Sequence, residues 1–364
     1  MNRVFPFVSF PVKQQASSAG CEEALEQRGS AKSARHLASP AAALMSVPYP
    51  LKSDDKCAAH AGRFAERART SLNRLAVVCL LALFSQVTPA DDAKALPPLP
   101  PLADPPTHLQ LPGKFVWADL FVEDDDKARQ FYSQLLGWTW RTIGSGPDAY
   151  DLAENDGIPI AGLVQRDRQK GEVAGGIWIS YVSVPDPGAS ASQIVSLGGK
   201  TLVPVTQVNG RGDFAIFSDP AGALFGIARS DSGDPPDYQS RIGDWIWIQL
   251  AARDATQAAK FYSAVAGFDM TERPDTGAAE DLLLVSGGYA RAGISQVDDD
   301  RPPVWVPFVR VGNAAGAAER AVALGAELIL PPQDDIMGGD LVVIADPAGA
   351  VLGLLTWDYE ETGE

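Results

Sequence analysis

Short stretches of alternating apolar and polar positions recur along this chain, and the clearest of them is residues 115–122. There Phe115, Trp117 and Asp119 fall on one face of a predicted strand, and the residues between them fall on the other. Residues 128–136 then carry apolar side chains three and four positions apart, the period of an amphipathic helix, and a glycine ends the pattern. Three further strand-like stretches follow, so the pattern predicts one strand, one helix and three strands.

The same order of elements occurs four times. Strands predicted at residues 177–184, 245–252 and 304–311 each begin another unit. Repeated motifs group the units into two copies, because Asp-Pro-Ala-Gly begins at Asp219 and again at Asp346, 127 residues later. The chain is therefore predicted to contain two tandem domains of α+β class, each made of two βαβββ units.

These repeats set the expected domain boundaries. The first domain should span residues 114–230 and the second residues 242–357. Residues 231–241 are rich in turn-forming residues and are expected to be a linker between the domains. The last residues, 358–364, form an acidic tail.

The residues before the first domain are expected to lie outside the folded core. Residues 1–74 show no sustained hydrophobic period and are interpreted as a disordered or wrongly assigned extension. Residues 75–90 combine a basic flank, an apolar run too short for a membrane span and small residues, the layout of a secretory signal. Residues 91–113 are rich in proline and predict an extended linker. We therefore expect a periplasmic or secreted protein, with a cytoplasmic protein as the alternative.

Charge and reactive residues are distributed unevenly. The first 90 residues carry 11 Lys and Arg against 6 Asp and Glu, whereas the whole chain has a net charge of −16. The folded part is therefore strongly acidic, which argues against nucleic acid as a partner. No His or Cys follows His108. Chemistry in the two domains must therefore use carboxylates, hydroxyls, Lys, Arg or the backbone.

The motifs resemble those of the vicinal oxygen chelate superfamily, which includes glyoxalases, bleomycin resistance proteins and extradiol dioxygenases. The residues that carry the resemblance are the helix signature at 128–138, its copy at 259–268, and the two Asp-Pro-Ala-Gly turns. The resemblance covers about residues 114–357. It implies that each domain forms a curved mixed sheet around a cleft, in which a divalent metal usually sits.

The family's usual metal ligands are not found at the matching positions. In the family these ligands are His or Glu on the first strand of each unit and Glu on the last strand. Counted from the helix starts and from the Asp-Pro-Ala-Gly turns, those positions hold Trp117, Ile179, Gly226, Trp247, Val306 and Gly353. None of these side chains can donate to a divalent ion. We therefore predict no metal, no other cofactor and no catalytic residue of the family type.

Strand alternation indicates which side chains line the clefts. The predicted ligand-binding residues are Trp117, Asp119, Tyr181 and Ser183 in the first domain, and Trp247, Gln249, Phe308 and Arg310 in the second. Aromatic rings with a few polar groups are typical of pockets for small hydrophobic or aromatic molecules. The tryptophans could equally fill the space of a lost metal site. Whether the clefts lie within or between the copies stays open at this point.

Three functions are compatible with these observations. The first is a metal-free, exported protein that binds a small molecule, as the bleomycin-type binders of the family do. The second is a lyase, isomerase or dioxygenase with a non-standard metal site. The third is a structural or interaction module with filled clefts.

Overall fold

A computed structural model of the chain describes residues 10–11, 98–145, 149–166, 175–272, 281–297, 302–334 and 336–359. The segment predicted to be a secretory signal, residues 75–90, lies outside this range. None of the described helices has the length and apolar character that a bilayer crossing requires.

The first domain is a single mixed sheet with two helices. Eight strands are ordered β3-β4-β5-β2-β6-β9-β8-β7, so the first strands of the two units, β2 and β6, pair antiparallel at the centre. The parallel pairs β2/β5 and β6/β9 flank this centre. The elements are β2 (Phe115–Val122), α3 (Asp125–Leu136), β3 (Thr139–Ile143), β4 (Tyr150–Asn155), β5 (Ile158–Gln165), β6 (Ile177–Ser183), α4 (Pro187–Ser196), β7 (Lys200–Val208), β8 (Gly212–Ser218) and β9 (Leu224–Ser230).

The second domain repeats this topology. Its strands are ordered β11-β12-β13-β10-β14-β17-β16-β15, and the two-residue strand β1 (Phe10–Pro11) pairs with β13. The elements are β10 (Trp245–Ala252), α5 (Ala255–Ala266), β11 (Asp269–Glu272), β12 (Asp281–Ser286), β13 (Tyr289–Gln296), β14 (Val304–Val311), α6 (Ala314–Ala323), β15 (Glu327–Leu330), the 3-10 helix η2 (Met337–Gly339), β16 (Leu341–Ala345) and β17 (Val351–Thr356). The predicted α+β fold of two tandem domains is therefore confirmed, and each sheet is formed within one copy.

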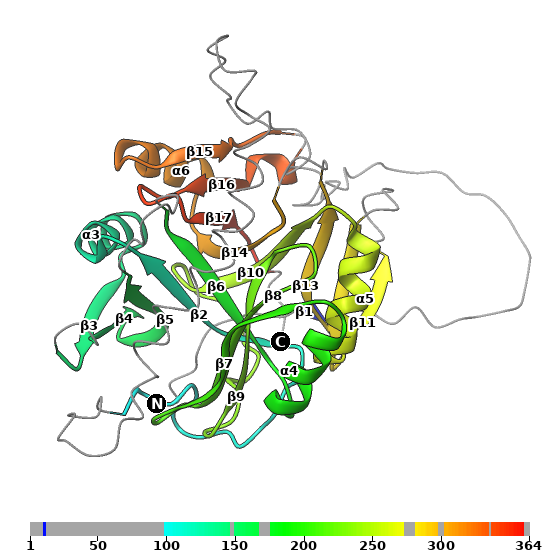
Figure 1. Cartoon of the computed structure of the whole chain (residues 1–364). Helices are drawn as coiled ribbons and strands as arrows, with labels where there is room; N and C mark the ends of the chain where they lie inside the picture. The colour runs from blue at the N-terminus through cyan, green and yellow to red at the C-terminus, as the bar shows by residue number, and fades with distance from the viewer. Residues whose placement is uncertain are drawn as a thin grey trace, which may run out of the picture.

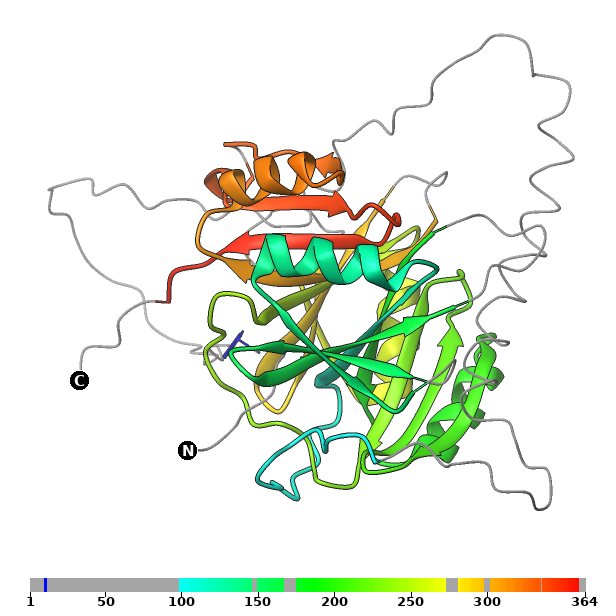
Figure 2. The same cartoon turned by 90° about the vertical axis from the view of Figure 1, so that its left-hand side faces the viewer.

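The helix starts follow the expected chemistry. Asp124, Asp186, Asp254 and Asn313 each cap a helix by accepting a backbone N–H three residues on. Helices of one domain lie beside helices of the other: α3 contacts α6, and α4 contacts α5 (Figures 1 and 2). One apolar core runs through both domains between the sheets and helices, and each sheet has a second, separate core on its other face. We call that other face the concave face.

A reciprocal pair of hydrogen bonds joins the domains. The Tyr132 hydroxyl on α3 donates to Asp346 at 2.8 Å, and the Tyr262 hydroxyl on α5 donates to Asp219 at 3.1 Å. Both carboxylates belong to the repeated Asp-Pro-Ala-Gly turns of the opposite domain. The repeated motifs therefore build the domain interface rather than a ligand site.

One predicted side-chain direction is wrong. Phe115 was expected on the same face as Trp117, but the register of β2 against β6 shifts between these two residues. The shift turns Phe115 into the interdomain core, where its ring centre lies 5.2 Å from that of Trp305. A β-bulge of this kind breaks the alternation on which the sequence argument relied.

Candidate binding site on the concave face of the first domain

Polar side chains meet in the middle of the concave face of the first domain. Oδ1 of Asp119 on β2 accepts hydrogen bonds from the Tyr150 hydroxyl at 2.7 Å and from Trp117 Nε1 at 2.8 Å. These three residues are at most 8% exposed. The predicted site residues Trp117 and Asp119 therefore do lie together, joined by a tyrosine from β4.

Arg211 reaches this group from the turn between β7 and β8. Its guanidinium carbon lies 3.9 Å from the centre of the Trp117 ring, a cation–π distance, and Nη1 donates to the Tyr150 hydroxyl at 3.3 Å. Nε donates to the Pro100 carbonyl at 3.0 Å. Nη2 has no hydrogen-bond partner among the described residues, although Arg211 is only 2% exposed. The group therefore holds a buried cationic donor that is unused.

Tyr181 on β6 completes this set, which we call the Asp119 cluster: Trp117, Asp119, Tyr150, Tyr181 and Arg211. Burial first, and the nearby charge of Asp119 second, raise the pKa of both tyrosines well above the usual tyrosine value. Both hydroxyls therefore stay protonated at physiological pH.

Two glycines make room for the Asp119 cluster. A Cβ atom on Gly162 would lie 1.8 Å from the Tyr150 hydroxyl oxygen, and one on Gly226 would lie 2.1 Å from the Tyr181 ring. In the sheet, Gly162 pairs with Asp119 and Gly226 pairs with Tyr181. The large side chain of one strand therefore covers the bare backbone of the next.

The second domain has the same layout with less polar side chains. Trp247 Nε1 donates to Gln249 at 2.9 Å, and Gln249 in turn donates to Ser295 at 2.8 Å. The Phe308 ring covers Gly353, where a Cβ atom would lie 2.0 Å from it. A glycine, Gly338, stands 127 residues after Arg211. The three predicted residues Trp247, Gln249 and Phe308 thus lie together, without a charged partner matching Arg211.

The residues present do not fit the divalent metal that the resemblance implies. The family's last-strand ligand position is a glycine in each domain, and the rings of Tyr181 and Phe308 occupy the space above it. The first-strand positions hold indole and aliphatic side chains, which offer no lone pair to a metal. Within the described ranges, no group of three or more His, Cys, Asp or Glu side chains could hold a metal ion.

Two predicted lining residues bind segments outside the Asp119 cluster and its second-domain counterpart. Ser183 donates to Asp234 at 2.6 Å, and Arg310 donates to the Ser240 carbonyl at 2.7 Å and to the Trp357 carbonyl at 2.8 Å. Both therefore hold the interdomain segment or the end of the chain in place.

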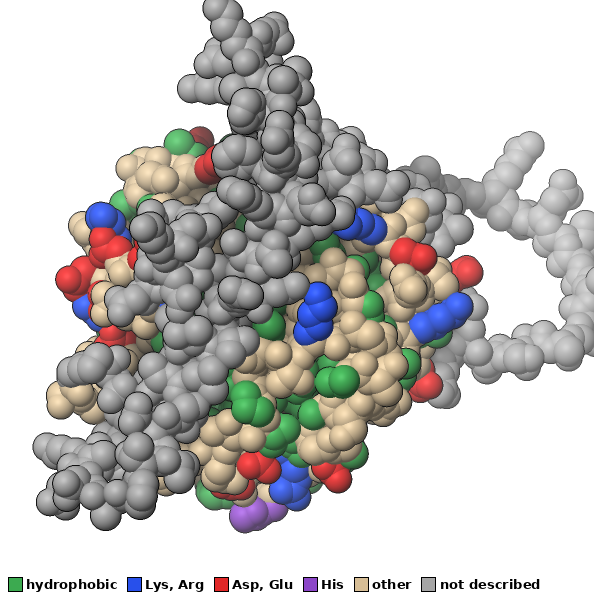
Figure 3. Space-filling view, in the orientation of Figure 1, with side chains coloured by type: hydrophobic (Ala, Val, Ile, Leu, Met, Phe, Trp, Pro, Cys, Tyr) green, Lys and Arg blue, Asp and Glu red, His purple; other side chains and the backbone are tan. Residues whose placement is uncertain are grey.

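A proline-rich segment covers the Asp119 cluster. We call residues 98–108 the strap. Leu102 of the strap is completely buried in the same apolar cluster as Trp117 and Tyr150, and Leu99 packs against that cluster. The predicted linker is thus, from residue 98 onward, part of the first domain's surface. His108, at the end of the strap, is exposed. The described part of the surface in Figure 3 mixes hydrophobic, acidic and basic side chains.

The second domain covers its concave face with its own loop. Ile336 and Met337, between β15 and β16, are buried in the apolar cluster that contains Trp247 and Phe308. In the first domain the corresponding connection between β7 and β8 is a tight turn at 209–211. The strap therefore takes the place that an internal loop holds in the second domain.

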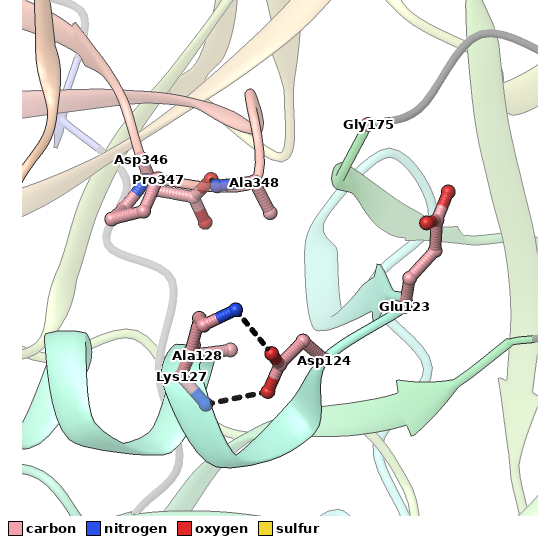
Figure 4. Close-up of a pocket in the computed structure, with 8 residues that line it drawn as sticks. All are labelled: Glu123, Asp124, Lys127, Ala128, Gly175, Asp346, Pro347 and Ala348. Atoms are coloured by element: carbon pink, nitrogen blue, oxygen red, sulfur yellow. Dashed lines mark hydrogen bonds and ion pairs between the residues drawn. The ribbon is translucent and has the colours of Figure 1, made fainter.

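A cavity of about 270 Å³ lies away from both concave faces, at the domain interface. Glu123, Asp124 and Lys127 at the start of α3 face the turn at Asp346 across it (Figure 4). Lys127 pairs with its neighbour Asp124 at 2.7 Å, and its side chain is 76% exposed. None of the predicted site residues lines this cavity.

Sequence reasoning missed Tyr150 and Arg211. Tyr150 stands at the start of an unremarkable strand pattern, and Arg211 belongs to an Arg-Gly-Asp turn whose side-chain direction no periodicity predicts. Two sequence features are connected with these residues. Gly162 leaves room for the Tyr150 hydroxyl, and the short turn between β7 and β8 carries Arg211.

Comparisons with known proteins agree with this architecture. Residues 114–227 match the glyoxalase/bleomycin resistance protein/dioxygenase superfamily, and residues 247–355 match a glyoxalase-like domain. CFP32 of Mycobacterium bovis, a candidate glyoxylase by its name, is 27% identical over 66% of this chain and 93% of its own length. The anthracycline biosynthesis protein DnrV of Streptomyces peucetius is 28% identical over 66% of this chain and 91% of its own length.

Solved structures of similar fold include enzymes of two kinds. The Mn(II)-bound glyoxalase from Novosphingobium aromaticivorans is 17% identical, with a TM-score of 0.48 over 68% of this chain and 83% of that chain. The 2,3-dioxygenase LapB from Pseudomonas sp. KL28 is 16% identical, with a TM-score of 0.46 over 69% of this chain and 94% of that chain. The two family matches together span more than half of the chain. The chain therefore belongs to the vicinal oxygen chelate superfamily, as a tandem of two glyoxalase-like domains.

Proposed function

We propose that this protein binds a small hydrophobic or aromatic molecule without a metal, and that the ligand lies on the concave face of the first domain. The observation that carries the proposal is the Asp119 cluster. It places a buried arginine with an unused N–H group beside tryptophan and tyrosine rings. A buried donor without a partner costs free energy, which a ligand oxygen would recover.

The stacking of Arg211 on Trp117 favours a flat ligand. The Arg211 guanidinium lies 3.9 Å from the centre of the Trp117 ring, a cation–π pair. A planar ligand could stack as a further layer on this pair. The relatives from Streptomyces are named as anthracycline biosynthesis proteins, and anthracyclines are flat aromatic molecules. This name supports an aromatic ligand for the present chain.

The alternative of an enzyme with a non-standard metal site has less support, because within the described residues no group of three or more His, Cys, Asp or Glu side chains could hold an ion. For the second domain we propose the structural role. Its concave face is filled by Phe308, Ile336 and Met337, and its polar groups Gln249 and Ser295 already bind each other.

A thermal-shift screen of flat aromatic compounds tests the binding function. The full chain should be screened beside Arg211→Lys and, as a control with the same substitution in the second domain, Arg310→Lys. We expect compounds that raise the Tm of the wild type and of Arg310→Lys but not of Arg211→Lys. Failure of every compound to raise the Tm, or metal retained at one ion per domain after incubation with zinc, nickel, manganese or ferrous iron, would overturn the proposal.

We also propose that the protein is exported, on the basis of the signal-like segment 75–90. Cell fractionation followed by N-terminal sequencing tests this proposal. A mature chain that begins near residue 91 in the periplasm or medium supports export, whereas an uncleaved chain in the cytoplasm contradicts it.

A further inference from the structure

We propose that the strap is an internal occupant of the first-domain site, and that it holds the place of a neutral ligand with a carbonyl-type acceptor oxygen and an apolar group. This inference rests on the proposed binding function and deepens it, because it names the ligand class and the contact that must open.

The strap places one acceptor and one apolar side chain on the cluster. The acceptor is the Pro100 carbonyl, which takes the Arg211 Nε proton at 3.0 Å. The apolar group is Leu102, which is fully buried among Trp117 and Tyr150. A small molecule that supplied the same two features could replace both contacts.

Arg211 could bind such a molecule with two donors. The strap uses Nε and leaves Nη2 without a partner. A free ligand that displaced the strap could accept from Nε and Nη2 together, in the fork geometry that arginine offers. Each of the three guanidinium nitrogens would then have an acceptor, which the strap does not achieve.

The charge of the cluster favours a neutral ligand. Arg211 and Asp119 are both buried in it, so one positive and one negative group already balance each other. An added carboxylate would leave a net negative charge in a buried site that also contains Asp119. A ketone, quinone or amide oxygen provides the acceptor without that cost.

The strap is held in a way that allows release. Its backbone is anchored beyond the cluster by Ser232, which accepts from Ala103 N at 3.0 Å through its side chain and from Thr107 N and His108 N through its carbonyl. Near the cluster, the Leu99 amide of the strap donates a hydrogen bond to the Asn209 carbonyl at 2.9 Å. Residues 98–102 can therefore lift while Ala103, Thr107 and His108 stay bonded to Ser232. A closed strap weakens the apparent affinity in proportion to the fraction of molecules that are open.

The test uses the full chain and two matched probes, 1-naphthamide and 1-naphthoate, titrated by calorimetry. Leu102→Ala removes the strap's apolar group, and Leu109→Ala, which alters a half-exposed leucine just beyond the strap, is the control. We expect Leu102→Ala to bind 1-naphthamide about tenfold more tightly than the wild type, because more molecules are open. Leu109→Ala should match the wild type, and 1-naphthoate should bind more weakly than the amide to every variant.

Hydrogen exchange at the Leu99 amide separates the possible failures. If Leu102→Ala speeds this exchange and 1-naphthamide affinity is unchanged while still depending on Arg211, the strap inference is overturned and the binding function stands. If exchange is faster and neither probe binds any variant, the inference and the proposed function both fail. Tighter binding of 1-naphthoate than of 1-naphthamide contradicts the neutral-ligand class.

Discussion

The two domains share one topology but close their concave faces differently. In the first domain a charged cluster around Asp119 is covered by the strap, which precedes the first strand of the domain, and Arg211 keeps an unused donor. In the second domain Gln249 and Ser295 are paired with each other, and a loop of the domain itself supplies Ile336 and Met337. The comparison supports our proposal that the first domain binds a ligand and that the second has a structural role.

The interface between the domains, unlike the concave faces, has the same contacts on both sides. The tyrosine–aspartate bonds of Tyr132 and Tyr262 are reciprocal, and a tryptophan donates to each tyrosine hydroxyl, Trp178 at 3.0 Å and Trp305 at 2.8 Å. The hydrogen bonds of the interface are therefore common to both domains, whereas the side chains on the two concave faces differ.

The interface carboxylates should be equally important in both domains. Asp346→Ala and Asp219→Ala each remove a buried acceptor for a tyrosine hydroxyl and for backbone N–H groups of the turn. We expect each variant to lower the free energy of unfolding by about 3 kcal/mol. Urea unfolding measures this, and a clear inequality between the two variants would contradict a symmetric interface.

Lys114 should give stability a pH dependence that the second domain lacks. This lysine is fully buried against Asp237 at 2.8 Å, and 130 residues later the chain has Asp244 in its place. Burial lowers the pKa of Lys114 to about 8. Between pH 8 and its ordinary pKa, the unfolded chain holds the proton that the folded chain has released, so stability rises with pH.

The measurement compares the wild type with Lys114→Met in urea from pH 7 to 10. Relative to the variant, the wild type should gain about 2 kcal/mol of unfolding free energy between pH 8 and 10. Parallel pH profiles for the two proteins would show that Lys114 does not titrate there.

The glycines under the aromatic rings should tolerate no side chain in either domain. Gly226→Ala and Gly353→Ala each place a methyl group against a buried ring, at Tyr181 and Phe308. We expect each to lower the free energy of unfolding by about 2 kcal/mol, through overpacking. Gly188→Ala, in α4, where a Cβ atom would lie no closer than 3.4 Å to its neighbours, is the control and should not lower the free energy of unfolding.

Sequence patterns predicted most of the fold because each unit repeats strong local signals. The capping residues Asp124 and Asp254 and the closing glycines Gly137 and Gly267 fix the helix ends. Strand alternation failed at the bulge near Phe115, where register is set by pairing with β6 and not by local sequence.

The site was less predictable because it depends on contacts distant in sequence. Alternation placed Trp117, Asp119 and Tyr181 on one face, but Tyr150 and Arg211 join them from other strands and turns. From the sequence alone, a proline-rich segment is interpreted as a spacer. That it covers the first concave face depends on Leu102 fitting the shape of that surface, which no periodicity encodes.

We propose that the first domain binds a ligand and that the second does not. Calorimetric titration of the full chain with 1-naphthamide, beside Arg211→Lys and the second-domain variant Gln249→Leu, tests this difference. We predict one molecule bound per chain, with binding lost in Arg211→Lys and retained in Gln249→Leu. Two molecules per chain, or binding lost in Gln249→Leu but not in Arg211→Lys, would contradict the claim.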